Sequence, residues 1–235
     1  MRPFFPYYGS KWRLAKAYGE PRHNRVIEPF AGSACYSVWW DVERADLYDL
    51  DDYICAVWDY LINVGVREVL NLPDLEAYGH IDDLKITQEA KWLIGYWLNA
   101  APSQPCKKLS SWGKIHRDKP QGGTYWGPNV RRRIANQLHM IRRWTITQAS
   151  YETIDQPRAT YFVDPPYQDR GKYYRHGSKS IDYSKLSEWC RGLSGQVIVC
   201  ENVGAQWLPF KVIGSTKTVK HKRSIEVVWK GEKND

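Results

Sequence analysis

The chain has 235 residues, 43% of them apolar, which is enough for one full hydrophobic core, so a chain that is disordered throughout is excluded. Its formal net charge of +8 favours a polyanionic partner, because clustered Lys and Arg release counterions from phosphates. Five scattered cysteines without a CxxC pair argue against a disulfide framework and a zinc site, and no stretch approaches the roughly 18 apolar residues of a membrane span.

Alternating strand and helix signals begin near the amino terminus. Residues 25–28 predict a short apolar strand, followed by a turn that contains Pro29 and Gly32 and then by a helix. The segment ADLYDLDD predicts a second strand that ends at Asp49. The next two segments, YICAVWDYLINV and TQEAKWLIGYWLN, space their large apolar residues as helices do, and Thr87 is a candidate N-cap.

The pattern breaks between Ala100 and Gly127, where Pro, Ser, Gly and basic residues form a segment too long for an ordinary connection inside a compact domain. We interpret this segment as a functional insertion. The next helix is expected to have one apolar face, with arginines on the rest of its surface. These arginines are equally compatible with a face exposed to solvent and with a face that contacts phosphates. The apolar positions are Val130, Ile134, Leu138 and Ile141, and the arginines are Arg131, Arg132, Arg133, Arg142 and Arg143.

Four more strand candidates, TITQAS, TYFVD, QVIVC and IEVVW, follow, with loops and a helix near residues 184–191 between them. This alternation of strands and helices is typical of a mostly parallel α/β sheet. Ligands of open α/β sheets bind at the carboxyl ends of the strands, so the residues directly after each strand are the candidates for function.

Two strand ends in the first half carry suitable groups. In EPFAGSA, Gly32 permits a close backbone approach, the helix start offers N–H groups to a carboxylate, and Glu28 suits a cation, although a plain strand-to-helix turn has the same signal. In LYDLDD, Asp49 lies 17 residues after Gly32 and can accept both hydroxyls of a ribose. Asp51 or Asp52 suits the cap of the next helix instead.

The third strand end is YFVDPPYQD, residues 161–169. Pro165 and Pro166 have no N–H group, so the loop after Asp164 presents carbonyl oxygens and cannot join a sheet ladder. A carboxylate beside the carbonyl of Pro165 suits an exocyclic amine, and Tyr167 offers a flat face to the ring that bears it. Two such acceptors would stabilise the positive charge that forms as the amine of adenine attacks a carbon electrophile. A proline turn whose aspartate only caps is the structural alternative.

Three motifs in this order, PYYGSKWR, EPFAGSA and DPPY, resemble those of the Dam-like adenine-N6 DNA methyltransferases, especially phage-encoded forms, over nearly the whole chain. The resemblance implies a seven-stranded Rossmann-like methyltransferase sheet. Residues 1–70 and 144–235 would form the catalytic domain that binds S-adenosylmethionine, and residues 71–143 a helical and loop insertion for target recognition. Because the opening segment lacks the apolar core of a signal peptide, we expect a cytoplasmic protein, in the host cytoplasm if it is phage-encoded. We further expect a monomer in solution, with no membrane and no metal as partners.

The resemblance also assigns roles to individual residues. The flipped adenine would be held by Asp164, Pro165, Pro166 and Tyr167, with direct methyl transfer to N6 and no covalent enzyme intermediate. Two residues depart from the family: Ala34 replaces the second glycine of the cofactor turn, and Tyr7 stands where many relatives have Trp. The expected cofactor-binding residues are Tyr7, Lys11, Glu28, Pro29, Phe30, Ala31, Gly32, Ser33, Asp49 and Asp164.

DNA contacts are expected from two basic segments. The insertion offers more phosphate-type contacts than Asn or Gln for adenine edges, which predicts relaxed recognition of a very short site. The loop QDRGKYYRHGSKS interleaves basic and aromatic residues with two glycines, which predicts a mobile loop that orders on DNA, with a solvated basic loop as the alternative. The candidates are Lys107, Lys108, Trp112, Lys114, Arg117, Arg170, Lys172, Tyr173, Arg175 and Lys179.

The leading hypothesis is therefore an S-adenosylmethionine-dependent adenine-N6 DNA methyltransferase that flips its target base. An RNA amino-methyltransferase would use the same acceptors. A catalytically silent DNA-binding protein on the same fold would have no need of intact Asp49, Asp164 and Tyr167. A nicotinamide-dependent oxidoreductase is disfavoured because FAGSACY lacks a complete GxGxxG.

Overall fold

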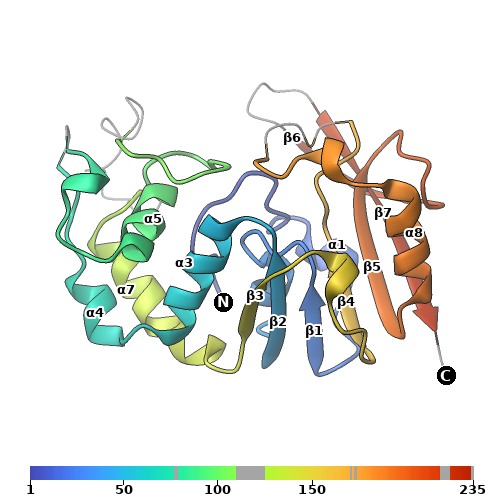
Figure 1. Cartoon of the computed structure of the whole chain (residues 1–235), viewed down its shortest axis with the longest axis horizontal. Coiled ribbons are helices and arrows are strands. Elements are labelled where there is room, and N and C mark those ends of the chain that lie inside the picture. Colours follow the sequence, from blue (N-terminus) through green and yellow to red (C-terminus); the bar gives the residue numbers. More distant parts are fainter. Residues whose placement is uncertain (77–78, 110–124, 170, 172–173, 218–222, 234–235) are drawn as a thin grey trace.

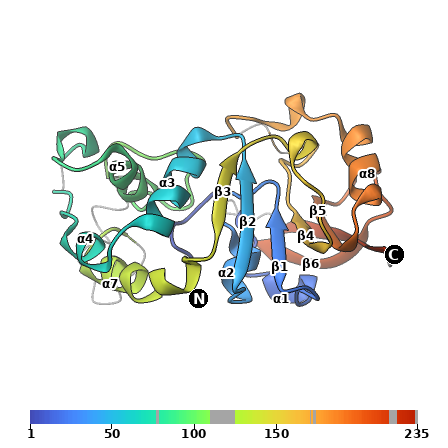
Figure 2. The ribbon, with the colours of Figure 1, turned by 60° about the horizontal axis from the view of Figure 1, so that its bottom comes forward.

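Seven strands form one mixed sheet, which confirms the predicted α/β class (Figure 1). The computed structural model describes residues 1–76, 79–109, 125–169, 171, 174–217 and 223–233. The strand order is β3-β2-β1-β4-β5-β7-β6, with parallel pairs from β3 to β5 and with β7 antiparallel to both of its neighbours. Figure 2 shows β1, β2 and β3 side by side. The strands are β1 (Arg25–Glu28), β2 (Arg44–Asp49), β3 (Thr145–Gln148), β4 (Ala159–Val163), β5 (Gly195–Asn202), β6 (Lys211–Lys217) and β7 (Arg223–Lys233).

The strand β6 is absent from the sequence prediction. It lies at the edge of the sheet, its pairing with β7 shifts register between Val212 and Gly214, and Val212 is 64% exposed. An irregular edge strand lacks the regular alternation of apolar and polar residues that marks a half-buried strand, which explains the omission. The strand β7 also extends beyond the predicted segment IEVVW at both ends.

Helix starts agree well with the capping signals of the sequence. Asp51 accepts a hydrogen bond from the N–H of Tyr53 at 3.0 Å, and Thr87 accepts one from the N–H of Ala90 at 3.4 Å. The predicted N-cap role of Thr87 is therefore confirmed, and so is the capping role considered for Asp51. The helices are α1 (Ala15–Tyr18), α2 (Cys35–Trp39), α3 (Asp52–Asn63), α4 (Val66–Asn71), α5 (Gln88–Tyr96), α7 (Pro128–Gln137) and α8 (Tyr183–Gly192), with the 3-10 turns η1 (Ile81–Asp83), η2 (Leu138–Ile141), η3 (Tyr151–Thr153) and η5 (Ser178–Ser180).

Each face of the sheet has its own hydrophobic core, because alternate residues of a strand point to opposite faces. Val26 and Phe162 pack with residues of α1, α2 and α3, whereas Ile27 and Tyr161 pack with residues of α8. The rings of Tyr36 in α2 and Phe162 stack, with their centroids 4.3 Å apart. With both faces covered, the strand ends are the parts of the sheet that are open to a ligand.

The arginines of α7 and of the following turn contact other parts of the protein. The apolar face of the helix is buried, as predicted. Arg131 forms an ion pair with Asp74, and the guanidinium of Arg142 donates to the backbone carbonyl of Ile62 in α3. For these two residues the structure favours an intramolecular role over the expected solvated or phosphate-facing one. The other contacts are Arg143 with Glu43, Arg132 with Asn129, and Arg133 with the Trp97 ring.

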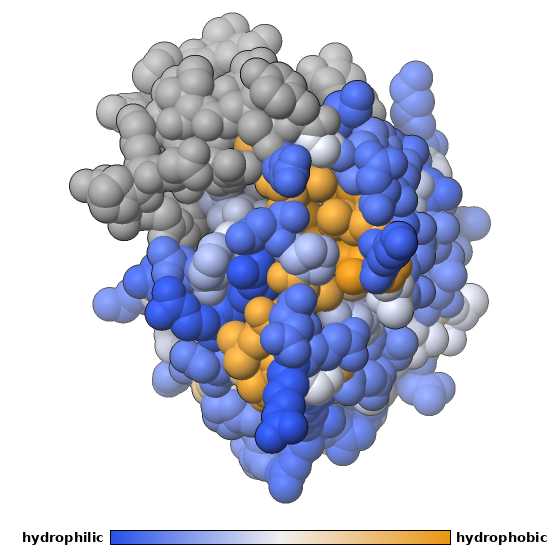
Figure 3. All heavy atoms as spheres, turned by 90° about the vertical axis from the view of Figure 1, so that its left-hand side faces the viewer, coloured by the Kyte–Doolittle hydropathy of each residue, from blue (hydrophilic) through white to orange (hydrophobic). Residues whose placement is uncertain are grey.

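The helices α4, α5 and α7 lie on the side of the molecule next to β3 (Figure 1). Helix α3 joins this group to the sheet, since it contacts α5 as well as β2 and β3. Seen from that side, hydrophilic residues surround a hydrophobic patch (Figure 3). Val66 and Leu70 of α4 are 45% and 40% exposed. Among the described helices, none has the length and apolar character needed to cross a membrane.

Candidate active site

A cavity of about 410 Å³ lies at the carboxyl ends of the parallel strands. Its lining includes Glu28, Asp49, Ala149 and Asp164, each of which ends a strand or directly follows one. The volume falls in the usual range of small-molecule sites, about 300–1,000 Å³. Of the expected site residues, Lys11, Pro165 and Tyr167 do not line the cavity, and those that do are Tyr7, Glu28, Pro29, Phe30, Ala31, Gly32, Ser33, Asp49, Asp164 and Pro166.

The turn after β1 brings backbone close to this cavity. Gly32 has a φ of +46°, and a Cβ atom there would lie 3.0 Å from the Tyr7 ring, so both the conformation and the space favour glycine. Ala34 has a φ of +43°, the left-handed region in which a side chain costs roughly 1–2 kcal/mol. Ala34, at the position where the methyltransferases that the motifs resemble have glycine, is therefore accommodated at the cost of backbone strain.

Asp49 ends β2 as predicted, with its carboxylate directed at this turn. Its two oxygens accept hydrogen bonds from the N–H groups of Gly32 and Asp51, both at 2.9 Å. Burial raises the pKa of Asp49 to about 6, and these two N–H groups oppose the rise. Each carboxylate oxygen has a further lone pair, so Asp49 can still accept hydrogen bonds from hydroxyl groups of a ligand.

Glu28 ends β1 and is only 2% exposed. Its Oε1 accepts a hydrogen bond from the N–H of Ser37 in α2 at 2.9 Å. Burial raises the pKa of Glu28 to about 8, although hydrogen bonds from Ser37 oppose the rise. At neutral pH the carboxyl group is therefore largely protonated, and a cation bound beside it would have to favour release of the proton.

The raised pKa of Glu28 predicts a pH-dependent stability. The folded state holds this proton up to about pH 8, whereas an unfolded glutamate loses it near its usual pKa of about 4.3. Between these values the folded state binds more protons, so stability falls as the pH rises. Glu28→Gln keeps an acceptor for Ser37 but cannot ionise. We expect it to raise the melting temperature relative to the wild type at about pH 8.5 and to have a much smaller effect at about pH 5.

Differential scanning calorimetry at the two pH values measures this difference. Glu232→Gln is the matched control, because Glu232 is an exposed glutamate of β7 whose ion pair with Arg22 is also exposed, so its replacement should change the melting temperature only slightly and equally at both. An equal shift of Glu28→Gln at the two pH values would show that ionisation of this carboxyl group does not limit stability.

Asp164 directly follows β4, and its carboxylate meets the side chain of Lys11. The distance from Nζ to Oδ1 is 3.0 Å, and the same ammonium group donates to the carbonyl of Gly9 at 2.8 Å. It also lies 4.5 Å from the centroid of the Tyr167 ring. Lys11, which the resemblance alone assigns to the site, therefore lies against two side chains of the DPPY motif.

Charge in this part of the site is balanced by close pairing. Burial disfavours the charged form of Lys11, but the carboxylates of Asp164 and Glu226 outweigh burial and raise the pKa of the lysine. Burial raises the pKa of Asp164, and the lysine opposes this rise. We describe the pair as ammonium and carboxylate, because loss of either charge would leave the other without compensation.

The DPPY loop is held by hydrogen bonds at two further points. The hydroxyl of Tyr167 donates to Oε1 of Glu226 in β7, a residue that is 3% exposed. The hydroxyl of Tyr183 in α8 donates to the carbonyl of Pro166 at 2.5 Å. The loop is thus fixed both to β7, which lies beside β5 in the sheet, and to α8, which packs on one face of the sheet.

The loop that follows the DPPY motif contacts the N-terminal segment and the start of α3, both of which lie beside the cavity. The hydroxyl of Tyr174 donates to the carbonyl of Tyr8 at 3.2 Å, and the two ring centroids are 5.4 Å apart. Arg175 forms ion pairs with Asp51 and Asp52 at the start of α3. Both Tyr174 and Arg175 line the cavity. In this conformation Arg175, expected to contact DNA, binds two carboxylates of the protein.

The remaining candidates for DNA binding belong to separate segments. Lys107 is 67% exposed and pairs with Asp82 of η1 at 3.0 Å, and the neighbouring Lys108 is exposed. Lys179 is an exposed residue of η5. Their role in DNA binding stays a prediction. The candidates that lie outside the described residues are Trp112, Lys114, Arg117, Arg170, Lys172 and Tyr173.

Several residues of the site are missing from the sequence prediction. Ala149 and Ser150 follow β3 and line the cavity, and the rule that selects the other strand ends applies to them equally. Glu226 is a lone carboxylate within the apolar strand SIEVVW, an unusual position for a charge and a usable signal. Tyr8 belongs to the motif PYYGSKWR and Tyr174 to the loop expected to contact DNA, but the sequence assigns neither to the cavity, because only the tertiary structure brings them there.

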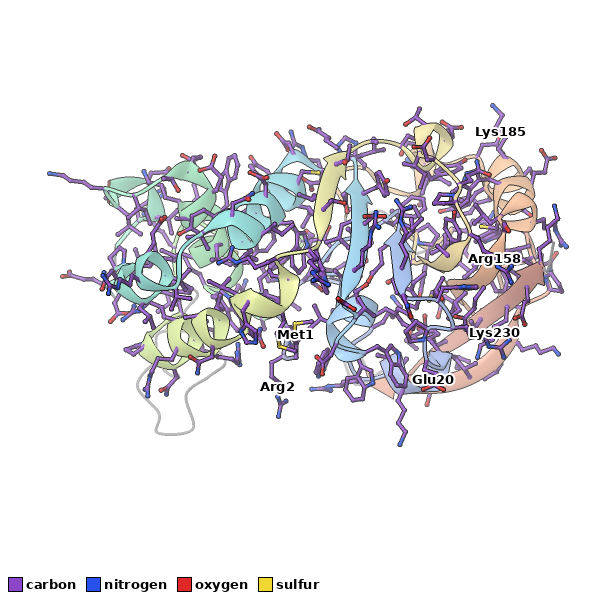
Figure 4. The ribbon with its side chains drawn as sticks, turned by 90° about the horizontal axis from the view of Figure 1, so that it is seen from below. Met1, Arg2, Glu20, Arg158, Lys185 and Lys230 are labelled. Carbon is purple, nitrogen blue, oxygen red and sulfur yellow. The ribbon has the colours of Figure 1, made fainter. Side chains whose placement is uncertain are left out.

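A second cavity, of about 640 Å³, lies at the opposite edge of the sheet, where β5 begins. Figure 4, which views the molecule from below, labels Glu20 and Lys230, and both residues line this cavity. The charged groups of this cavity are exposed, and two of them, Arg22 and Glu232, pair with each other. Exposed ion pairs shift the pKa values of their members little, because solvent screens them. We therefore place the candidate active site at the first cavity, where buried and half-buried carboxyl groups converge.

No protein-family model and no curated protein matches the chain. Among solved structures, a protein of Haemophilus influenzae described as a "putative methylase" matches with 9% sequence identity and a TM-score of 0.37. The match covers 97% of this chain and 92% of the other. A likeness this weak supports no conclusion on function, and the fold follows from the strand order and pairing alone.

Proposed function

We propose that this protein is an S-adenosylmethionine-dependent methyltransferase that modifies the N6 amine of adenine in DNA. The observation that carries the proposal is the convergence of the Gly32 turn, Asp49 and Asp164 on one cavity at the carboxyl ends of parallel strands. These residues come from motifs that are far apart in the sequence. Their convergence is therefore a property of the fold and supports the reading of the motifs as parts of one site.

The lining of the cavity suits S-adenosylmethionine. Asp49 has lone pairs for the hydroxyl groups of a ribose, and the Gly32 turn brings backbone close to the same region. Phe30 and Tyr7 add aromatic surface, and Glu28 adds a carboxyl group that can face the amino group of the methionine moiety. When bound, the cofactor supplies a methyl group activated by its sulfonium.

The residues of the DPPY motif would act on the target base. In the proposed reaction, Asp164 and the carbonyl of Pro165 accept the two hydrogens of the amine, whose lone pair is delocalised into the ring and is a poor nucleophile. The negative charge of Asp164 and the partial negative charge of the carbonyl oxygen would stabilise the positive charge that forms on the nitrogen as it bonds to the methyl carbon and the bond from that carbon to sulfur breaks. Loss of one proton from the nitrogen to solvent would complete the transfer. Lys11 favours the ionised form of Asp164, and Tyr167 would supply the stacking face. Extrusion of the base from a duplex would bring the amine within reach.

Methyl incorporation tests this proposal directly. The purified protein is incubated with S-adenosylmethionine labelled in its methyl group and with duplex DNA, single-stranded DNA or RNA of matched sequence. We expect label in DNA, recovered after digestion as N6-methyldeoxyadenosine. Faster incorporation into RNA than into either form of DNA would assign the same chemistry to RNA.

Calorimetric titration with S-adenosylmethionine separates the cofactor from the reaction. We expect binding in the absence of nucleic acid, because Asp49 and the Gly32 turn are in place without it. Binding without transfer to any of the polymers would favour a catalytically silent protein on this fold. Absence of binding would overturn the proposed cofactor.

A further inference from the structure

A buried carboxylate of β7 holds the tyrosine of the DPPY motif. Oε1 of Glu226 accepts hydrogen bonds from the hydroxyl groups of Tyr167 and Tyr18, the latter at 3.0 Å. Tyr167 belongs to the loop after β4 and Tyr18 to α1. Three elements that are distant in sequence therefore meet at one oxygen atom.

Nothing in the pairing of the strands requires a charged residue at the position of Glu226. The residue pairs with Asn202 of β5 and with Gly214 of β6, and the two residues that follow it, Val227 and Val228, are buried. A carboxylate in such a position costs stability unless its oxygens are satisfied. The two tyrosine hydroxyls satisfy Oε1, and the ammonium of Lys11 favours the charge, so the carboxylate is explained by its place beside Tyr167, Tyr18 and Lys11.

Tyr167 is fixed along its whole length by these contacts. Its backbone carbonyl accepts a hydrogen bond from the N–H of Gly171 at 2.7 Å, its hydroxyl is held by Glu226, and the ammonium of Lys11 lies 4.5 Å from its ring centroid. The hydroxyl contact fixes the outer end of the ring, and the ammonium of Lys11 lies near its centroid. Stacking on a base needs a ring in a defined position, so the hydroxyl contact bears on the use of the ring as a platform.

We propose that Glu226 is a positioning residue of the target-base site, which fixes the position and the long axis of the Tyr167 ring through its hydroxyl group. This inference rests on the proposed methyl transfer to a base. Glu226 does not line the cavity assigned to the cofactor. The contact therefore affects the step that needs the base and leaves the affinity for S-adenosylmethionine unchanged.

A double-mutant cycle tests the inference on single-turnover methyl transfer to DNA. Tyr167→Phe removes only the hydroxyl, Glu226→Ala removes the acceptor, and Glu226→Gln keeps an acceptor without the charge. We expect Glu226→Ala to slow transfer about tenfold or more, as for loss of a hydrogen bond to a charged group, and Glu226→Gln to slow it less. In the Tyr167→Phe background, either substitution should slow transfer clearly less than in the wild type, because only the contacts of Glu226 with Tyr18 and its charge near Lys11 are then lost.

Thermal melting confirms that each variant is folded, and the cycle is completed with Glu226→Gln if the alanine variant is not. Glu232→Gln, on the same strand but exposed, is the control and should keep the wild-type rate. Equal losses with and without the Tyr167 hydroxyl, or a parallel loss of cofactor affinity, would overturn the inference. A wild-type protein that methylates no nucleic acid would overturn the proposed function and this inference together, whereas active wild type with uncoupled variants would overturn the inference alone.

Discussion

Replacing Asp164 by asparagine is expected to slow single-turnover methyl transfer by about 100- to 1,000-fold, the typical cost of removing one preorganised group that stabilises charge in a transition state. Asparagine has the shape of aspartate but lacks its negative charge, and one of its two polar atoms donates instead of accepting. Binding of S-adenosylmethionine should stay close to that of the wild type, because Asp49 and the Gly32 turn are unchanged. Rate and calorimetric affinity are measured on the same preparations.

Asp169→Asn is the matched control for this substitution. Asp169 lies in the same loop but is exposed, so its replacement should keep the wild-type rate. Thermal melting of Asp164→Asn shows whether Lys11, which loses its partner, still permits folding. Full activity of Asp164→Asn would contradict the role of the carboxylate as an acceptor of the amine. A fall in cofactor affinity as large as the fall in rate would assign Asp164 to the cofactor instead.

The part of the site that the sequence predicts is the part fixed by strand ends. Glu28, Asp49 and Asp164 end or directly follow β1, β2 and β4, and these strands are neighbours or next neighbours in the sheet. Parallel neighbouring strands have their carboxyl ends at the same edge, so the carboxylates had to lie near one another once the strands were correct. Correct prediction of three short buried strands was therefore enough to assemble this half of the site.

The other half depends on pairings that no local pattern encodes. Glu226 reaches Tyr167 because β7 lies beside β5, and β7 takes this place as part of a hairpin with β6, whose irregular edge pattern hides it. Arg175 counts as a free cation in the sequence, but the fold puts it beside Asp51 and Asp52. A count of basic residues therefore overstates the charge that is available to DNA, as it does for Arg131 and Arg142.

Lys11→Met is expected to lower the free energy of unfolding by about 3–5 kcal/mol at neutral pH, the typical cost of leaving one member of a buried ion pair without its partner. The lysine is 8% exposed, and its Nζ lies 3.0 Å from Oδ1 of Asp164. Methionine has a similar length and is apolar, so most of the original packing can remain. Urea denaturation followed by tryptophan fluorescence measures the loss.

The sign of the pH dependence follows from the carboxylate left behind. Burial already raises the pKa of Asp164, and without Lys11 to oppose it the pKa rises further. Between the usual pKa of an unfolded aspartate, about 3.9, and this raised pKa, the folded state of the variant binds more protons than the unfolded state, so its stability falls as the pH rises. The deficit relative to the wild type should therefore be larger at about pH 8 than at about pH 5. A deficit that does not change with pH would mean that the lysine stabilises the fold by packing.

The double variant Lys11→Met with Asp164→Asn isolates the pair itself. With neither charge present, most of the lost stability should return, and the double-mutant cycle should show strong coupling. Lys107→Met is the control, because its pair with Asp82 is exposed and screened by solvent, so its loss should change stability little. Restored stability with methyl transfer still absent would show that Asp164 is required for chemistry beyond its partnership with Lys11. Restored activity would instead show that the loss in Asp164→Asn comes from an unpaired lysine, and the carboxylate would then have no direct part in the reaction.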